Sequence, residues 1–297
     1  MLIEVYDVGG TWVRAALADR KDNVIFYEKI KEPTEKDFCS QIRKLSSQLR
    51  KKGTPDCVSV IVPGPVDKGI LLKAPPMNLN EPIDLNFNLG TLHEHVYFGN
   101  DLNAAVQAEL VEGYGKQYKN FYVLTLSTGI GSGIVLDGIP LMNKSGEFGH
   151  SVLERQYAKI FRCGCGNNGC WSSLCSGNGI ENLIDFYLEE NLSCEEFFEF
   201  AKQKPFRAQW ILDTVRDYNA QGIGNMINAL DMEAIIVMGS LGLSQFDSII
   251  PNKEEISKYT VNSIPEILKT RLGDDIGLLG AYYYGWVHAT GIYSLIM

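Results

Sequence analysis

One pattern, a strand followed by a glycine-rich turn and a second strand, occurs twice in this chain and restricts the folds open to it. Leu2–Asp7 is predicted to be a strand, Val8–Thr11 a tight turn with two glycines, and the residues from Trp12 onward another strand. The same order returns roughly 120 residues later, in the strand Phe121–Leu126, the turn Ser127–Gly133 and the strand after it. Because each segment is long enough to form a domain, the pattern predicts a duplicated, two-domain α/β protein.

Length and composition agree with two ordinary globular domains. The 297 residues are 45% hydrophobic and 21% charged, so apolar material suffices for two cores. We expect a smaller N-terminal domain at residues 1–117 and a larger one at 118–279, with a C-terminal helix at about 280–297 packing onto the first.

Charge and hydropathy narrow the partners and the location. A formal net charge of -9 argues against a nucleic-acid partner, which requires a concentrated basic surface. No apolar run approaches the ~20 residues that cross a bilayer, and no signal peptide opens the chain, so we expect a soluble cytoplasmic protein without a membrane partner.

The two glycine turns indicate where a phosphate group binds. Without side chains in the way, the backbone at Gly9 and Gly10 can approach a phosphate closely, and Asp7 stands at the end of the strand beside them. Taken alone, such a turn is equally an ordinary hairpin. Two of them in a duplicated protein predict a nucleotide held in a cleft between the halves.

A histidine and three cysteines follow with the spacing of a metal site. The pattern H-x12-C-x-C-x4-C, interleaved with glycines that allow sharp turns, suits a closed, structural zinc site of the Cys3His type. A disulfide, a redox pair or scattered thiols are the alternatives, and a disulfide is disfavoured in a reducing compartment. The four expected ligands are His150, Cys163, Cys165 and Cys170. We expect Cys39, Cys57, Cys175 and Cys194 to be core or surface thiols.

A polar junction between a strand and a helix carries the strongest candidate for catalysis. Val96–Gly99 is predicted to be a strand, and a helix should start within Asn100–Asn103 and run to about Glu112. An Asp here is commonly an N-cap, but three polar residues exceed what a cap requires. We assign Asp101 to function and capping to Asn103. Asn78, in a proline-rich loop, either faces a ligand or ends a turn.

The rest of the chain supplies further α/β elements. Residues 35–52, 179–190, 193–202 and 208–230 should be helical, and residues 57–62 and 234–238 should be buried strands. The loop Gly239–Gly242 flanks an adenine or simply turns the chain. The aromatic stripe Tyr282–Trp286 of the last helix is predicted to pack in a core.

Together these segments resemble the ROK family of sugar kinases and regulators over nearly the whole chain. The resemblance implies the two-domain actin-like ATPase (ribonuclease H-like) fold with an interdomain cleft, a cytoplasmic transferase of carbohydrate metabolism, and a homodimer. It rests on motifs in the expected order, namely Asp7–Thr11, Gly64–Asp67, Asn100-Asp101, Ser127–Gly133, Gly146–His150 and the three cysteines.

The resemblance also implies a role for each matching residue. Asp101 would be the general base that takes the proton from a sugar hydroxyl, and the structural Zn²⁺ would do no Lewis-acid work. The sugar would be bound by Gly64, Asn78, Asn100, Asp101, Glu147 and His150. The phosphates of ATP and Mg²⁺ would be held by Asp7, Gly9, Gly10, Thr11, Thr128, Gly129 and Gly131, with Gly239 and Gly242 beside the adenosine.

Two departures from the family pattern bear on the ligands. A sugar-binding Glu usually follows two residues after the last cysteine, where this chain has Ser172, and the Gly239–Gly242 loop lacks the consecutive glycines often present. We therefore expect an ATP-dependent hexose kinase resembling glucokinases, with an N-acetylmannosamine or N-acetylglucosamine kinase as the close alternative. A sugar-sensing regulator or a non-catalytic sugar-binding protein is the alternative of another class.

Overall fold

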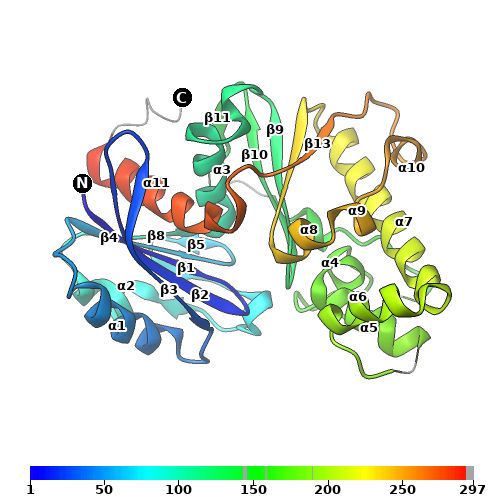
Figure 1. Ribbon diagram of the computed structural model, residues 1–297, viewed down its shortest axis with the longest axis horizontal. Coiled ribbons are helices and arrows are strands. Elements are labelled where there is room, and N and C mark those ends of the chain that lie inside the picture. Colours follow the sequence, from blue (N-terminus) through cyan, green and yellow to red (C-terminus); the bar gives the residue numbers. More distant parts are fainter. Residues whose placement is uncertain (143–145, 158, 189, 292–297) are drawn as a thin grey trace. The chain divides into compact units, whose positions relative to one another are not determined.

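The computed structural model describes residues 1–142, 146–157, 159–188 and 190–291 (Figure 1). The chain divides into two compact units. The first unit comprises Met1–Lys119, Val135–Lys144 and Arg271–Met297, and the second comprises Asn120–Ile134 and Ser145–Thr270. The expected helical residues 292–297 lie outside the described residues.

The first unit is built on a five-stranded mixed sheet. Its order is β3-β2-β1-β4-β8, with β1 antiparallel to β2 and parallel to β4. The central strands β1 and β4 are buried throughout and mostly apolar, with Glu4, Asp7 and Ser59 as exceptions, whereas the edge strand β3 alternates between half-buried and exposed residues. The strands are β1 (Ile3–Val8), β2 (Trp12–Arg20), β3 (Val24–Pro33), β4 (Cys57–Val62) and β8 (Val96–Asn100).

Helices cover both faces of this sheet. Helix α1 places an apolar stripe that includes Ile42 and Leu45 against Tyr6 and Val8 of β1, and α11 packs against β1, β4 and α3 (Figure 1). Asp37 caps α1 by accepting from Ser40 N, so the helix begins later than the predicted residue 35. The helices are α1 (Phe38–Leu49), α2 (Leu85–Leu89), α3 (Asp101–Val111) and α11 (Ile276–Thr290). Short elements complete the unit: β5 (Val66–Asp67), β6 (Ile70–Leu71), β7 (Ile83–Asp84), β11 (Ile139–Pro140), η1 (Pro75–Met77), η2 (Gly90–Leu92), η3 (Tyr114–Lys116) and η5 (Gly273–Asp275).

The C-terminal helix α11 is a core helix. Tyr282, Tyr283 and Tyr284 are buried, and the Tyr284 hydroxyl donates to Phe98 O at 2.9 Å, which confirms the predicted packing role of the aromatic stripe. The helix ends where Gly291 takes a left-handed conformation. None of the described helices is both long and apolar enough to cross a membrane.

The second sheet repeats the order of the first. It runs β11-β10-β9-β12-β13, so that three strands consecutive in sequence are again followed by strands parallel to the first of them. The predicted turn after β9 was too long, because β10 already begins at Ile130 and includes Gly131 and Gly133. The edge strand β13 was not predicted. The strands are β9 (Phe121–Leu126), β10 (Ile130–Leu136), β12 (Ala234–Met238) and β13 (Glu266–Lys269).

The second unit is otherwise helical. The predicted loop Gly239–Gly242 is wrong in part, since α8 begins at Ser240, directly after a left-handed Gly239. Pro205 occupies the first position of the long helix α7, where its missing N–H costs no hydrogen bond. The helices are η4 (Phe148–His150), α4 (Ser172–Cys175), α5 (Gly177–Tyr187), α6 (Cys194–Gln203), α7 (Pro205–Ala229), α8 (Ser240–Ser244), α9 (Phe246–Ile249) and α10 (Lys253–Ser257).

Candidate functional site

The first glycine turn, between β1 and β2, contacts the loop that holds Asn78. Gly9 N donates to Trp12 O at 2.8 Å and closes the turn. Gly10 lies against Pro76 of η1, because a Cβ at Gly10 would come within 2.5 Å of Pro76 O. Asn78 takes a left-handed conformation at the end of η1, so it does end a turn, and its side chain is exposed and accessible to a ligand. The structure thus brings two predicted ligand segments together.

Asp7 is a buried carboxylate with one cationic partner. Its side chain lies 3.2 Å from Arg14 Nη1, and the β1–β2 register pairs the two residues directly. Burial raises the pKa of the Asp7 carboxyl, and the Arg14 guanidinium opposes that rise. A Cβ at Gly277, at the start of α11, would lie 2.1 Å from the Asp7 carboxylate. Sequence reasoning missed Arg14, although the tight turn between the two strands places it opposite Asp7.

The amide of Asn100 joins the start of α3 to the loop at Gly64. Its Oδ1 accepts from Leu102 N at 3.0 Å and from Asn103 N at 3.1 Å, and its Nδ2 donates to Gly64 O at 3.0 Å. Asn100 is therefore the N-cap of α3, and the capping role predicted for Asn103 is wrong.

Asp101 is the first residue of α3 and is half-buried. Its Oδ1 accepts from Leu102 N at 2.8 Å. Since Asn100 already caps the helix, the fold does not require a second acid or amide here. The carboxylate therefore stands at the positive end of the helix dipole.

In the second unit, β10 holds the segment that carries Glu147 and His150. Ser132 donates to Gly146 O through both its N, at 2.8 Å, and its Oγ, at 2.9 Å. A Cβ at Gly149 would come within 2.0 Å of Ile130 O, so only glycine allows this approach. The backbone of β10 therefore fixes the position of η4.

The same end of the second sheet gathers the remaining predicted residues. Thr128 and Gly129 form the turn itself, which Ser127 N closes by donating to Gly129 O at 3.0 Å. A Cβ at Gly239 would meet Leu126 O at 2.4 Å, and one at Gly242 would meet the Leu126 side chain at 3.2 Å. Both glycines predicted to border adenosine thus lie beside the last residue of β9.

Ser172 also belongs to this neighbourhood. Its Oγ accepts from Ile130 N at 3.2 Å, so the side chain that stands in place of an expected glutamate bonds to the first residue of β10. Ser172 is the first residue of α4, directly after Trp171. The position therefore lies beside the second glycine turn.

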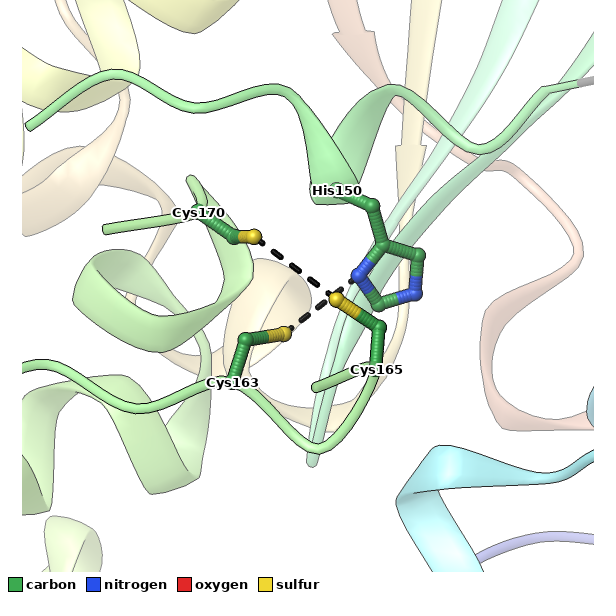
Figure 2. A group of neighbouring side chains, drawn as sticks. All are labelled: His150, Cys163, Cys165 and Cys170. Carbon is green, nitrogen blue, oxygen red and sulfur yellow. Dashed lines mark hydrogen bonds between the residues drawn. The ribbon is translucent and has the colours of Figure 1, made fainter. Parts of the chain in front are cut away.

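His150 and the three cysteines form one cluster (Figure 2). Their ligand atoms all lie within 4.8 Å of one another, with Cys165 Sγ 3.8 Å from Cys170 Sγ and Cys163 Sγ 3.4 Å from His150 Nδ1. A tetrahedral zinc with Zn–S of about 2.3 Å and Zn–N of about 2.0 Å separates two sulfurs by about 3.8 Å and sulfur from nitrogen by about 3.5 Å. The cluster fits a zinc ion, and 3.8 Å is too long for a disulfide.

The loop around the cluster is tied to the body of the second unit. Gly166 N donates to Cys163 O at 3.0 Å and forms the turn between the ligands, and Cys170 pairs with Val152 in a β-bridge. Trp171, next to the last ligand, is fully buried and donates its Nε1 to Asn219 Oδ1 of α7 at 2.8 Å. Burial, together with the nearby sulfurs, raises the pKa of the Cys170 thiol.

His150 presents its two ring nitrogens to different neighbours. Nδ1 faces Cys163 (Figure 2), whereas Nε2 lies 3.7 Å from Glu147 Oε2. One ring can therefore serve a metal with one nitrogen and leave the other beside Glu147.

Comparison with known proteins identifies the family to which the chain belongs. The model of the ROK family matches residues 5–287. The chain belongs to the ROK family. It is 32% identical over 290 residues to a glucokinase of Pyrobaculum calidifontis, covering 93% of this chain and 92% of that protein. It is 28% identical over 295 residues to an N-acetyl-D-glucosamine kinase of Pectobacterium atrosepticum, covering 93% and 96%.

The structural match extends over both units of this ROK chain. A ROK family glucokinase from Streptomyces griseus, in complex with glucose and AMPPNP, aligns with a TM-score of 0.78 at 21% identity, covering 95% of this chain and 98% of that one. The ROK chain has the two-domain actin-like ATPase fold that was predicted from its motifs.

Within this ROK chain, each unit collects its own share of the predicted site residues. The first unit brings together the Asp7–Thr11 turn with Asn78, and Gly64 with Asn100 and Asp101. The second unit brings together the Thr128–Gly131 turn, Glu147, His150 and the cysteine cluster.

Proposed function

We propose that this chain is an ATP-dependent hexose kinase resembling glucokinases, with Asp101 as the general base. It is a transferase of the ROK sugar-kinase type. The observation that carries the assignment of the base is the junction of β8 and α3, where Asn100 caps the helix and the half-buried Asp101 is its first residue. A carboxylate at the carboxyl end of a parallel strand is where α/β folds place their chemistry.

The proposed reaction requires only a weak general base but precise positioning of the two reactants. Phosphoryl transfer passes through a loose transition state, so the attacking hydroxyl needs little activation and an aspartate suffices to accept its proton. Asp101 takes the proton of the sugar hydroxyl, which we assign to the 6-hydroxyl, as the oxygen attacks the terminal phosphate. Most of the rate enhancement then comes from holding the reactants in line.

The two glycine turns supply the nucleotide site in this proposal. Asp7, Gly9, Gly10 and Thr11 act on the ATP phosphates and Mg²⁺ from the first unit, and Thr128, Gly129 and Gly131 from the second. Mg²⁺, when bound with ATP, neutralises phosphate charge. Asp7 supplies the one carboxylate among the residues of the first turn assigned to this site. Gly239 and Gly242 border the adenosine.

The cluster of Figure 2 holds a structural zinc ion in this proposal. The separations of Cys165 Sγ from Cys170 Sγ and of Cys163 Sγ from His150 Nδ1 match edges of a zinc tetrahedron, and three thiolates with one imidazole would form a closed site with no position left for substrate. Zinc thus fixes the loop that carries His150, so that Glu147 and His150 meet the sugar.

In this proposal the sugar is bound by Gly64, Asn78, Asn100, Asp101, Glu147 and His150. Ser172 stands where a further carboxylate is expected, which leaves the choice among glucose, N-acetylmannosamine and N-acetylglucosamine to experiment.

Release of ADP from ATP and Mg²⁺ over a panel of sugars tests the proposal. The panel holds glucose, mannose, fructose, allose, N-acetylglucosamine and N-acetylmannosamine, with Asp101→Asn as the blank. We expect turnover with at least one hexose or N-acetylhexosamine that the variant does not support. Silence over the whole panel with folded, zinc-loaded protein would contradict the kinase assignment.

A further inference from the structure

The first glycine turn is held by a residue to which the proposed reaction assigns no role. Thr34 directly follows β3 and is half-buried. Its Oγ1 donates to Gly9 O at 2.7 Å, and its N donates to Thr11 O at 3.0 Å. The hydroxyl and the amide of this one residue therefore bond to the backbone on both sides of Gly10.

The bond to Gly9 O fixes the direction of a backbone amide in the turn. A peptide unit is planar and trans, so its C=O and N–H point in opposite directions. Because Gly9 O is turned towards the Thr34 hydroxyl, the N–H of Gly10 points away from Thr34. Backbone N–H groups in turns form the concavities that bind phosphate oxygens. The orientation of this peptide therefore matters for any phosphate bound at the turn.

Thr34 is held in turn by Gln41, a polar residue of α1 that is only 1% exposed. The Gln41 Nε2 donates to Pro33 O at 2.8 Å, and its Oε1 accepts from Glu35 N at 3.0 Å. One side-chain amide thus bonds to both peptide units of Thr34. The peptide between Pro33 and Thr34 contacts Gln41 through its C=O and Thr11 through its N–H, so it links the helix to the turn.

The burial of Gln41 indicates a requirement for a fixed backbone rather than for core volume. The other buried residues of α1 are mostly apolar, and a leucine at position 41 would fill similar space. Hydrogen bonds made by a buried amide add little net stability, because the same groups bond to water in the unfolded chain. A fully bonded polar group does select one conformation of the segment that it contacts. Here that segment is Pro33–Glu35.

We propose that Thr34 and Gln41 are positioning residues for the nucleotide, which orient the Gly9–Thr11 turn for the phosphates of ATP. This inference rests on the proposed nucleotide site at that turn. Thr34 acts by holding Gly9 O and Thr11 O, and Gln41 acts by holding Thr34. Neither side chain needs to touch the nucleotide.

Calorimetric titration with AMPPNP and Mg²⁺ tests this role without relying on turnover. Thr34→Val keeps the shape of the side chain but loses the donor to Gly9 O. We expect it to raise the dissociation constant of AMPPNP by about tenfold, the upper value for one neutral hydrogen bond. Thr34→Ser keeps a hydroxyl and should restore the wild-type affinity. Gln41→Leu should weaken binding in the same direction, and circular dichroism checks that each variant is folded.

Thr290→Val is the matched control, because its hydroxyl also donates to a backbone carbonyl of the first unit, that of Trp286 in α11, at 2.8 Å. It should leave the dissociation constant unchanged. A folded Thr34→Val that binds AMPPNP as tightly as the wild type, or a Thr34→Ser that binds as weakly as Thr34→Val, would overturn the positioning role alone. A wild-type chain that binds no AMPPNP would overturn the proposed nucleotide site and this inference with it.

Discussion

Arg14 illustrates how a single residue sets the charge state of the site. It lies across the β1–β2 hairpin from Asp7, whose burial raises the carboxyl pKa while the guanidinium opposes the rise. A carboxyl with a raised folded-state pKa stabilises the fold below its unfolded pKa, and that contribution is lost as pH rises through the folded value. By pairing with the ionised carboxylate, Arg14 reduces this loss of stability. Removing Arg14 should therefore lower the free energy of unfolding most at pH values where Asp7 is ionised.

Arg14→Met should therefore destabilise the fold by about 2 kcal/mol at neutral pH, the value of a hydrogen bond to a charged group. The loss should shrink at about pH 3, where carboxyl groups are protonated in both proteins. Urea unfolding at the two pH values measures the difference. Arg14→Lys, which keeps a cation, should lose less. Equal destabilisation by Arg14→Met at both pH values would mean that packing, not the charge of Arg14, is what Asp7 needs.

In the proposed sugar site, Ser172 is the position at which we expect the choice among sugars to be set. Ser172→Glu introduces the carboxylate that the ROK pattern leads us to expect, and it should change the Michaelis constant of at least one sugar by about tenfold or more, the value of a charge-assisted hydrogen bond. Ser172→Ala is the control, because it also loses the bond to Ile130 N without adding a charge. A sugar profile that Ser172→Glu leaves unchanged would show that the position does not face the sugar.

At the scale of elements, we expect the loop that carries the zinc ligands to depend on its metal. Few of its backbone hydrogen bonds belong to regular structure, so a bound zinc ion would hold its four ligands together. Elemental analysis should find about one zinc per chain, and Cys165→Ser should lower that content and the melting temperature together. Cys194→Ser, outside the cluster, should change neither. A metal-free protein with an unaltered melting temperature would contradict a structural zinc.

The sequence predicted those elements whose signals are local. The strands β1, β4, β9 and β12 are mostly apolar runs bounded by turns, and the spacing of one histidine and three cysteines predicted the four ligands that the structure brings together. It misplaced the start of β10, because Gly131 and Gly133, which we took as turn residues, lie within the strand. The short edge strand β13 and helix α8 were missed, since four or five residues carry too little periodicity to be recognised.

Residues whose roles depend on distant partners were harder to predict. Asn100 was singled out as one of three polar residues at a junction, but its bond to Gly64 joins positions 36 apart in sequence. The ion pair of Asp7 with Arg14 follows from hairpin register, which the sequence contains but which we did not use. The close approach of Gly277 to Asp7 depends on how α11 docks, and no local pattern encodes that.

At the scale of the whole molecule, the chain is two copies of one topology. In both sheets, three strands that are consecutive in sequence are followed by two strands parallel to the first of them. The glycine turn recurs because it joins the first two strands of each sheet, so its repetition indicated the repeated fold. The chain also returns to the first unit at Val135 and again at Arg271, so no single cut separates the units. The actin-like fold therefore arises from a repeat in sequence and contacts that are not local.

The central claim is that Asp101 serves catalysis rather than the start of a helix. The decisive measurement compares turnover and sugar affinity in Asp101→Asn, which keeps the shape of the side chain and an acceptor for Leu102 N. We expect turnover to fall by about 10²–10⁴-fold, the contribution of a general base, while the dissociation constant of the sugar stays within about threefold. Normal turnover in this variant would contradict the account and make Asp101 only the first residue of α3.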